Sequence, residues 1–268
     1  MARGVSPVDE ARLQARLWTP ALVLPAVWLD AADLSTITIA TGVSEWRDKS
    51  GNGRHMTAPG AQPALAANSL NGLNTIAFDN RTTTQTLTNA YSYSGTDITL
   101  VSLAYSLRGT VRTYYTRLWS MNATGQQDFN NNSGFIMVYG VGTALDNVAT
   151  LRNNSILAQS TINSNAQWAF HVGTKSGGSG TFSTNGEARV SGSTSNSALG
   201  FNVIRIGNDV GGVDSGLFGN VAEAMIFSYA LNLSQQQTIE GYLAHKWGLT
   251  ANLPAAHPFK NRPPLIGD

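Results

Sequence analysis

The 268-residue sequence contains no cysteine, and only 12% of its residues carry a charge. Without cysteine, the chain can form neither a disulfide framework nor a thiolate zinc site. Acidic and basic residues balance to a net charge of +1, so the chain lacks the basic surface with which nucleic-acid-binding proteins neutralise phosphates. Hydrophobic residues make up 42%, which is enough for a full core. We therefore expect a folded protein that does not bind nucleic acid.

Long hydrophobic runs are also missing. No segment reaches the roughly 18 consecutive apolar residues that a membrane-spanning helix needs. The most apolar stretch, residues 17–29, is interrupted by two prolines, and Asp9 and Glu10 lie where a signal peptide would carry its basic leader. The sequence thus predicts no membrane association and no signal peptide, and synthesis in the cytoplasm.

Short segments rich in β-branched and aromatic residues are abundant. Strands are expected at residues 98–105, 134–139, 167–172 and 221–227. Turn signals rich in glycine and asparagine separate them, and Asn185-Gly186 predicts a hairpin over residues 181–190. Because no long helical period alternates with these strands, the pattern favours an antiparallel β-sandwich over a parallel sheet.

Two helices are predicted to bracket the strands. The first spans residues 6–18, begins at Ser6 and ends before a Thr-Pro pair. The second begins at Ser234, where Gln237 completes a capping box, and stops at Gly248. The proline-rich residues 253–264 after it are expected to lie extended along the body or a neighbour.

Several motifs follow one another in a fixed order. They are residues 26–33 with Trp28 and Asp30, residues 43–54 with Trp46, Asp48, Gly51 and Gly53, residues 219–227 with Glu223, and residues 239–249 with Trp247. In this order and spacing the chain resembles the laminin-G-like branch of the concanavalin A-like jelly rolls. The closing segment resembles a tail found on such domains in bacterial surface proteins and in tailed-phage virion proteins.

The resemblance implies an all-β fold, a jelly-roll sandwich of two antiparallel sheets with short helices at both ends. It divides the chain into an N-terminal arm (residues 1–25), the jelly-roll domain (26–233), and a C-terminal helix with a proline-rich tail packed on the body (234–268). Function varies widely within this superfamily, so the residues must be weighed separately.

Asp48 lies in a glycine-rich segment at the end of a predicted strand. We expect its carboxylate to accept backbone N–H bonds in a tight turn, with Gly51 and Gly53 supplying positive φ. The alternative is a calcium site using Asp48 and Asn52, for which one carboxylate is a poor ligand set. Asp209 and Asp214 form a second calcium candidate with the same turn alternative.

Acidic residues do not form a catalytic pattern. Glucanases of this fold family carry two glutamates and an aspartate on one strand, whereas no two glutamates here share a strand. Glu223 lies within an apolar strand, where a lone carboxylate is costly to bury, so we predict a cross-strand pair with Arg205. We predict that the protein is not an enzyme and that it needs no cofactor.

The histidines and serines likewise form no recognisable site. No two histidines have the spacing of a metal pair, and no serine elbow has partner residues. His171 alternates with apolar neighbours and is expected to be a half-buried, hydrogen-bonded side chain.

Two segments are candidate contact surfaces. Residues 105–117 supply possible interface or glycan contacts, namely Arg108, Arg112, Tyr114, Tyr115 and Arg117, because arginine and tyrosine anchor many interfaces. The alternative is a solvated strand whose tyrosines cover the sandwich. The amide-rich residues 126–133 are better explained by turn chemistry than by glycan binding.

The N-terminal arm carries apolar side chains on two adjoining faces of the predicted helix, among them Val8, Leu13, Leu17 and Trp18. So short a helix needs a docking surface. That surface is the protein's own sandwich, a sister subunit or a larger assembly.

These observations predict a non-enzymatic structural and binding module. The resemblance favours a component of a tailed-phage virion, such as a head decoration, head fibre or tail fibre. Its expected partners are other virion proteins, further copies of itself and a host surface glycan. The alternatives are a bacterial surface or secreted carbohydrate-binding module and a glycan-degrading enzyme.

Overall fold

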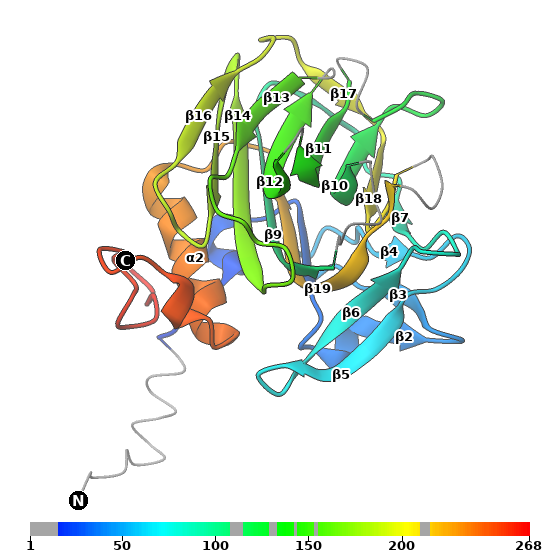
Figure 1. Ribbon diagram of the computed structural model, residues 1–268, viewed down its shortest axis with the longest axis horizontal. Coiled ribbons are helices and arrows are strands. Elements are labelled where there is room, and N and C mark those ends of the chain that lie inside the picture. The colour runs from blue at the N-terminus through cyan, green and yellow to red at the C-terminus, as the bar shows by residue number, and fades with distance from the viewer. Residues whose placement is uncertain (1–15, 108–114, 129–132, 142–143, 153–154, 210–214) are drawn as a thin grey trace, which may run out of the picture.

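The computed structural model describes residues 16–107, 115–128, 133–141, 144–152, 155–209 and 215–268, and the statements below concern these residues. Two antiparallel sheets face each other, and one α-helix lies beside the sandwich (Figure 1). The predicted all-β sandwich of antiparallel sheets is confirmed. No helix in the described ranges is long and apolar enough to span a membrane.

Sheet I has eight strands. In spatial order they are β16 (Val190–Ser193), β15 (Ser179–Thr184), β14 (Ala169–Ser176), β9 (Ile98–Ser106), β19 (Phe218–Phe227), β6 (Leu73–Asp79) and β5 (Ala64–Leu70), and β1 (Val27–Asp30) also pairs with β19.

Sheet II has nine strands. They are β13 (Ser155–Gln159), β12 (Ala144–Arg152), β11 (Phe135–Val141), β10 (Thr116–Asn122), β18 (Val203–Ile206), β7 (Leu87–Asn89), β4 (Met56–Thr57), β3 (Val43–Trp46) and β2 (Ile37–Ile39). A two-stranded ribbon joins β17 (Leu199–Phe201) to β8 (Tyr93–Gly95). The 3₁₀ turns are η1 (Pro20–Val23), η2 (Leu34–Thr36) and η5 (Thr250–Asn252).

The main core lies between the two sheets. Trp46, Trp119 and Phe182 are among its largest fully buried side chains. The strands predicted at 98–105, 134–139, 167–172 and 221–227 are β9, β11, β14 and β19. The apolar runs of β9, β11 and β19 are nearly continuous because one face of each strand fills this core and the other face packs in a separate apolar cluster.

A second core lies on the other face of sheet I, beneath helix α2 (Leu233–Lys246). Ile239, Leu243 and Trp247 pack there against apolar side chains of β9, β14 and β19. The predicted helix start was two residues late, because Asn232 is the N-cap and completes the capping box with Gln235. Asparagine caps as well as serine, so the same spacing fits both positions.

Residues 17 and 18, near the start of the described chain, lie with the C-terminal tail against α2. Leu17 forms a β-bridge with Leu265, and the Trp18 amide donates to the Pro264 carbonyl. The Trp18 ring meets the Tyr242 ring edge-on at 5.8 Å between centroids. The prediction of a helix over residues 6–18 falls outside the described residues up to position 15, and residues 16–18 are not helical.

The proline-rich tail turns instead of running extended. The His257 amide donates to the Pro254 carbonyl, and the Lys260 amide donates to the His257 carbonyl. The Lys260 ammonium then binds three main-chain carbonyls of residues 250–253. Proline has no backbone N–H group to donate, so in this tail, turn hydrogen bonds and the Lys260 ammonium satisfy main-chain carbonyls instead.

His171 on β14 is fully buried rather than half-buried as predicted. Its imidazole bonds to the Tyr139 hydroxyl of β11 at 3.2 Å and to the Thr184 hydroxyl of β15 at 3.0 Å. Burial lowers its pKa from 6.5 to about 3, so the folded protein holds it neutral. His171 is thus a polar link between the two sheets.

This burial predicts an acid sensitivity that depends on one residue. Because the pKa of His171 is lower in the folded than in the unfolded chain, its contribution to stability is complete above pH 6.5 and is lost as the pH falls towards 3. We expect this group to remove about 2 kcal/mol between pH 6.5 and pH 5. Urea unfolding of His171→Gln should show that much less loss over the same interval, and parallel pH profiles would contradict the prediction.

Candidate functional site

The sequence motifs at residues 26–33, 219–227 and 239–249 converge on one buried carboxylate, that of Glu223 on β19. One of its oxygens accepts from Trp28 Nε1 at 2.7 Å and from the Tyr242 hydroxyl at 2.9 Å. The other accepts from Trp247 Nε1 and from the Lys246 ammonium, each at 2.7 Å. All four donors come from β1, α2 and the residue that caps α2, so the carboxylate ties the helix to sheet I.

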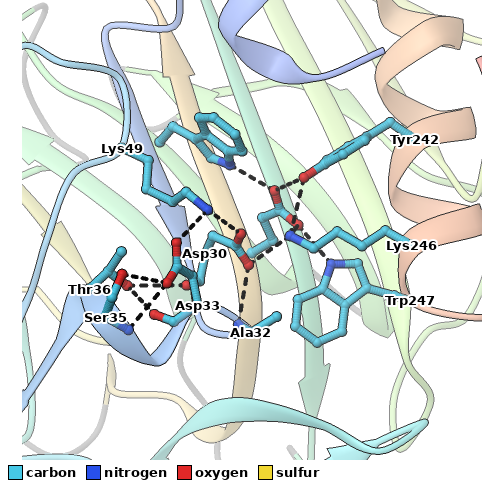
Figure 2. Close-up of polar contacts among 11 residues, drawn as sticks. Asp30, Ala32, Asp33, Ser35, Thr36, Lys49, Tyr242, Lys246 and Trp247 are labelled. Carbon is cyan, nitrogen blue, oxygen red and sulfur yellow. Dashed lines mark hydrogen bonds and ion pairs between the residues drawn. The ribbon is translucent and has the colours of Figure 1, made fainter. Parts of the chain in front are cut away.

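A chain of alternating charges continues from this carboxylate towards the surface. Lys246 also contacts Asp30 at 2.7 Å, and Lys49 contacts Asp30 at 2.9 Å and Asp33 at 2.8 Å (Figure 2). Burial raises the pKa of Glu223, while the charge of Lys246 opposes that rise. The hydrogen bond from Lys49 lowers the pKa of Asp33 to about 2.

The predicted partner of Glu223 was wrong. Arg205 lies on β18 in sheet II and donates to Asn122, whereas β19 pairs with β1, β6 and β9 of sheet I. Glu223 has no exposed surface and its four acceptor positions are filled. It is therefore saturated by its own fold and has no acceptor position left for a ligand.

Asp48 behaves as the turn interpretation predicts. Its carboxylate accepts from the backbone amides of Trp28, Ser50 and Arg54 at 2.9 to 3.0 Å, and from the Ser50 hydroxyl at 2.7 Å. Gly51 and Gly53 have φ of 87° and 69°. The four bonds leave no carboxylate lone pair for calcium.

Metal clusters are not found elsewhere in the described ranges. No three His, Asp or Glu side chains there are grouped to hold a metal ion. Asp209 of the second calcium candidate is in an ion pair with Arg117 at 3.3 Å, and Asp214 lies outside the described residues.

The candidate contact surface at residues 105–117 needs one correction. Arg117 is 3% exposed and makes a two-pronged ion pair with Asp128 at 3.0 and 3.1 Å, so it is an internal residue and not an interface contact. Tyr115 is partly buried against a small cluster on sheet II. The other three, Arg108, Arg112 and Tyr114, lie outside the described residues.

The candidate arm is likewise only partly described. Leu17 and Trp18 contact the chain's own C-terminal tail, and Trp18 is 6% exposed. Val8 and Leu13 lie outside the described residues.

An open groove of about 650 Å³ lies between the β15–β16 loop, the start of α2 and the C-terminal tail. We call it the α2 groove. Its apolar surface comes from Ala188, Leu233, Pro254 and Ala256. The loop that forms one wall follows Asn185 and Gly186, whose φ values of 54° and 73° end β15 and let residues 186–189 turn towards the helix.

A fixed polar network forms the floor of the α2 groove. The Arg189 guanidinium donates to Glu240 at 2.7 Å and to the Gln236 side-chain oxygen at 3.2 Å. Glu240 is fully buried and also accepts from the Ser183 hydroxyl at 2.7 Å and from His257 Nε2 at 3.2 Å. The buried carboxylate of Glu240 therefore neutralises the charge of Arg189.

Unused hydrogen-bonding capacity remains on the groove wall. Arg189 has five N–H groups, of which three are engaged. Glu187 accepts from Ser160 and from the Thr184 amide on one oxygen and from Thr161 on the other, which leaves one acceptor position. The side-chain amide of Gln237 lines the groove and has no hydrogen bond to another described residue.

This mixture of donors and acceptors suits a ligand with many hydroxyls, since each hydroxyl both donates and accepts. It does not suit nucleophilic catalysis. Ser183 donates directly to a carboxylate and has no imidazole to take its proton, because Glu240 lies between Ser183 and His257. The groove can therefore bind a small polar ligand against fixed partners.

Sequence patterns did not identify this groove. Glu187, Arg189 and Gln237 lie in a loop and on a helix that are brought together by the packing of α2 on sheet I. Only the Asn185-Gly186 turn pointed to the loop, and it gave no indication of what the loop faces.

The chain matches no protein-family model and no curated protein. Solved structures do share its fold. The binding domain of Paraclostridial Mosquitocidal Protein 1 aligns with a TM-score of 0.58 at 14% identity over 82% of this chain and 52% of that one. Domain 4 of AbnA, an extracellular arabinanase from Geobacillus stearothermophilus in complex with arabinotriose, aligns with a TM-score of 0.56 at 14% identity over 79% and 95%.

A sialidase from Trypanosoma rangeli aligns with a TM-score of 0.54 at 13% identity over 84% of this chain and 33% of that one. The chain thus spans about half of the mosquitocidal binding domain and a third of the sialidase. At these identities the likeness concerns the fold, which is a β-sandwich consistent with the concanavalin A-like class.

Proposed function

We propose that this protein is a non-catalytic carbohydrate-binding module and that the α2 groove holds the glycan. The observation that carries the proposal is the unused hydrogen-bonding capacity of Glu187, Arg189 and Gln237 beside the apolar side chains of Leu233 and Pro254. Sugar rings present hydroxyl edges and apolar C–H faces, so they match both kinds of wall.

The size of the groove and the fold support this proposal. A volume of about 650 Å³ lies in the range of small-molecule sites, which is roughly 300 to 1,000 Å³. A domain of the same fold that covers most of this chain was solved with arabinotriose. The saturated Glu223 and the central position of Glu240 support a binding role over catalysis.

Gln237→Ala tests the groove with little risk to the fold, because the Gln237 side chain makes no hydrogen bond to another described residue. On a panel of arabinotriose, cellotriose, maltotriose and chitotriose, we expect calorimetry to show binding of at least one by the natural chain. The variant should bind that sugar about three- to tenfold more weakly, which corresponds to one or two lost hydrogen bonds.

The matched control is Gln167→Ala, which removes an exposed glutamine near the start of β14 and outside the groove. Its affinity should equal that of the natural chain. If the natural chain, Gln237→Ala and Gln167→Ala bind a sugar with equal affinity, the binding site lies outside the α2 groove. If the natural chain binds no sugar of a broad glycan array, the proposed function is wrong.

For the biological setting, we propose a component of a tailed-phage virion, as a head decoration, head fibre or tail fibre that contacts other virion proteins and further copies of itself. The resemblance of residues 239–249 and of the tail after them to segments of phage virion proteins supports this setting, and their resemblance to bacterial surface proteins supports the alternative below. Mass spectrometry of purified particles should find the chain at a fixed copy number. Its presence instead on the bacterial cell surface or in the culture medium would favour the alternative of a bacterial carbohydrate-binding module.

A further inference from the structure

The charges of the α2 groove do not cancel. Arg189 is neutralised by Glu240 at 2.7 Å. His257 accepts the Phe259 amide at Nδ1 and donates from Nε2 to Glu240, which is the bonding pattern of a neutral imidazole. Glu187 has no cationic partner among the described residues and lines the groove. One negative charge therefore remains on the wall.

The Glu187 carboxylate is also held in place. The Ser160 hydroxyl binds one oxygen at 2.7 Å and the Thr161 hydroxyl binds the other at 3.0 Å, while the Thr184 amide adds a third bond. A carboxylate held by three donors cannot swing away from an approaching anion. The start of α2 contributes a partial positive charge of about one half at most, which reduces the negative charge of the groove without reversing it.

We infer that the α2 groove selects uncharged glycans and rejects acidic ones, with Glu187 as the specificity-determining residue. This inference rests on the proposed function, since it names the class of ligand for the same groove. Glu187 plays two parts. Its remaining lone pair accepts a hydrogen bond from a sugar hydroxyl, and its charge repels the carboxylate of a uronic or sialic acid.

The test uses a glycan array of neutral oligosaccharides and their counterparts that bear uronic or sialic acid, with lactose and sialyllactose as one pair. Calorimetry on the best neutral and acidic pair then gives affinities for the natural chain and for Glu187→Gln. We expect the natural chain to prefer the neutral member, and the variant to bind the acidic member about five- to tenfold more tightly than the natural chain does.

Affinity of Glu187→Gln for the neutral member should fall by about threefold, because the glutamine oxygen keeps the bonds to Ser160 and the Thr184 amide while its NH₂ group replaces the lone pair that accepts from the sugar hydroxyl. The two affinities of the variant therefore change in opposite directions. The preference of the natural chain should also shrink between about 0.1 M and 1 M salt, as the Debye length falls from about 10 to 3 Å. An unchanged melting temperature would show that the variant folds.

Glu45→Gln is the matched control, since it makes the same change in net charge at a partly exposed residue of β3 in sheet II. It should leave both affinities unchanged. If the natural chain binds the acidic member as tightly as the neutral one, or if both variants gain acidic affinity equally, the inference is wrong while the proposed function stands. If no glycan binds at all, the proposed function fails and the inference fails with it.

Discussion

Glu223→Gln is expected to lower the free energy of unfolding by about 3 to 5 kcal/mol, the usual cost of breaking a buried, hydrogen-bonded ion pair. Each carboxylate oxygen accepts two donors, so in either orientation the glutamine NH₂ group faces two donors that it cannot accept from. The midpoint temperature of thermal unfolding should fall by about 10 °C.

Glu45→Gln provides the comparison for Glu223. Glu45 pairs with Arg47 at 2.9 Å, but the two side chains are 28% and 53% exposed, and such pairs contribute at most about 1 kcal/mol. Chemical unfolding of both variants measures the difference directly. Losses of similar size would show that the four-donor arrangement around Glu223 is not what stabilises the attachment of α2.

Arg117→Met is expected to cost about 3 to 5 kcal/mol as well, for the opposite reason. Methionine fills much of the volume but leaves the carboxylates of Asp128 and Asp209 buried beside each other without the guanidinium that both contact. Both carboxylates are almost fully buried, so water cannot solvate them once the guanidinium is removed.

The double variant Arg117→Met/Asp128→Leu separates charge from volume. Removing one of the two acids should recover part of the stability lost in Arg117→Met, since one buried charge is removed with its repulsion. Arg47→Met in the exposed pair should be nearly neutral. A double variant that is no more stable than Arg117→Met would contradict this electrostatic explanation.

The strands and the Asp48 turn could be predicted from the sequence, because each is determined by residues that are close together in the chain. The runs at β9, β11 and β19 are apolar because alternate side chains of each strand enter two different apolar clusters. The Asp48 turn follows from a short acidic side chain among glycines. The start of α2 was missed by two residues because Asn232 and Ser234 both satisfy the capping pattern.

Partners far apart in the chain could not be predicted in the same way. Glu223 was recognised as a buried acid, but its choice of Lys246 over Arg205 depends on which sheet each strand joins and on where α2 packs. Arg117 was read as a surface residue because arginine usually is one, whereas Asp128 and Asp209 make its burial favourable. The α2 groove combines a loop, a helix and a tail, which only the assembled fold brings together.

The position of the donors to Glu223 also bears on how the protein is made. The carboxylate of Glu223 is synthesised before three of its four donors, Tyr242, Lys246 and Trp247. Until these residues leave the ribosome, β19 carries a carboxylate that lacks most of its donors, and the face of sheet I that α2 covers is exposed. A chain that stops before residue 247 therefore leaves an apolar sheet face and an unsatisfied acid, which makes it a substrate for chaperones and proteases.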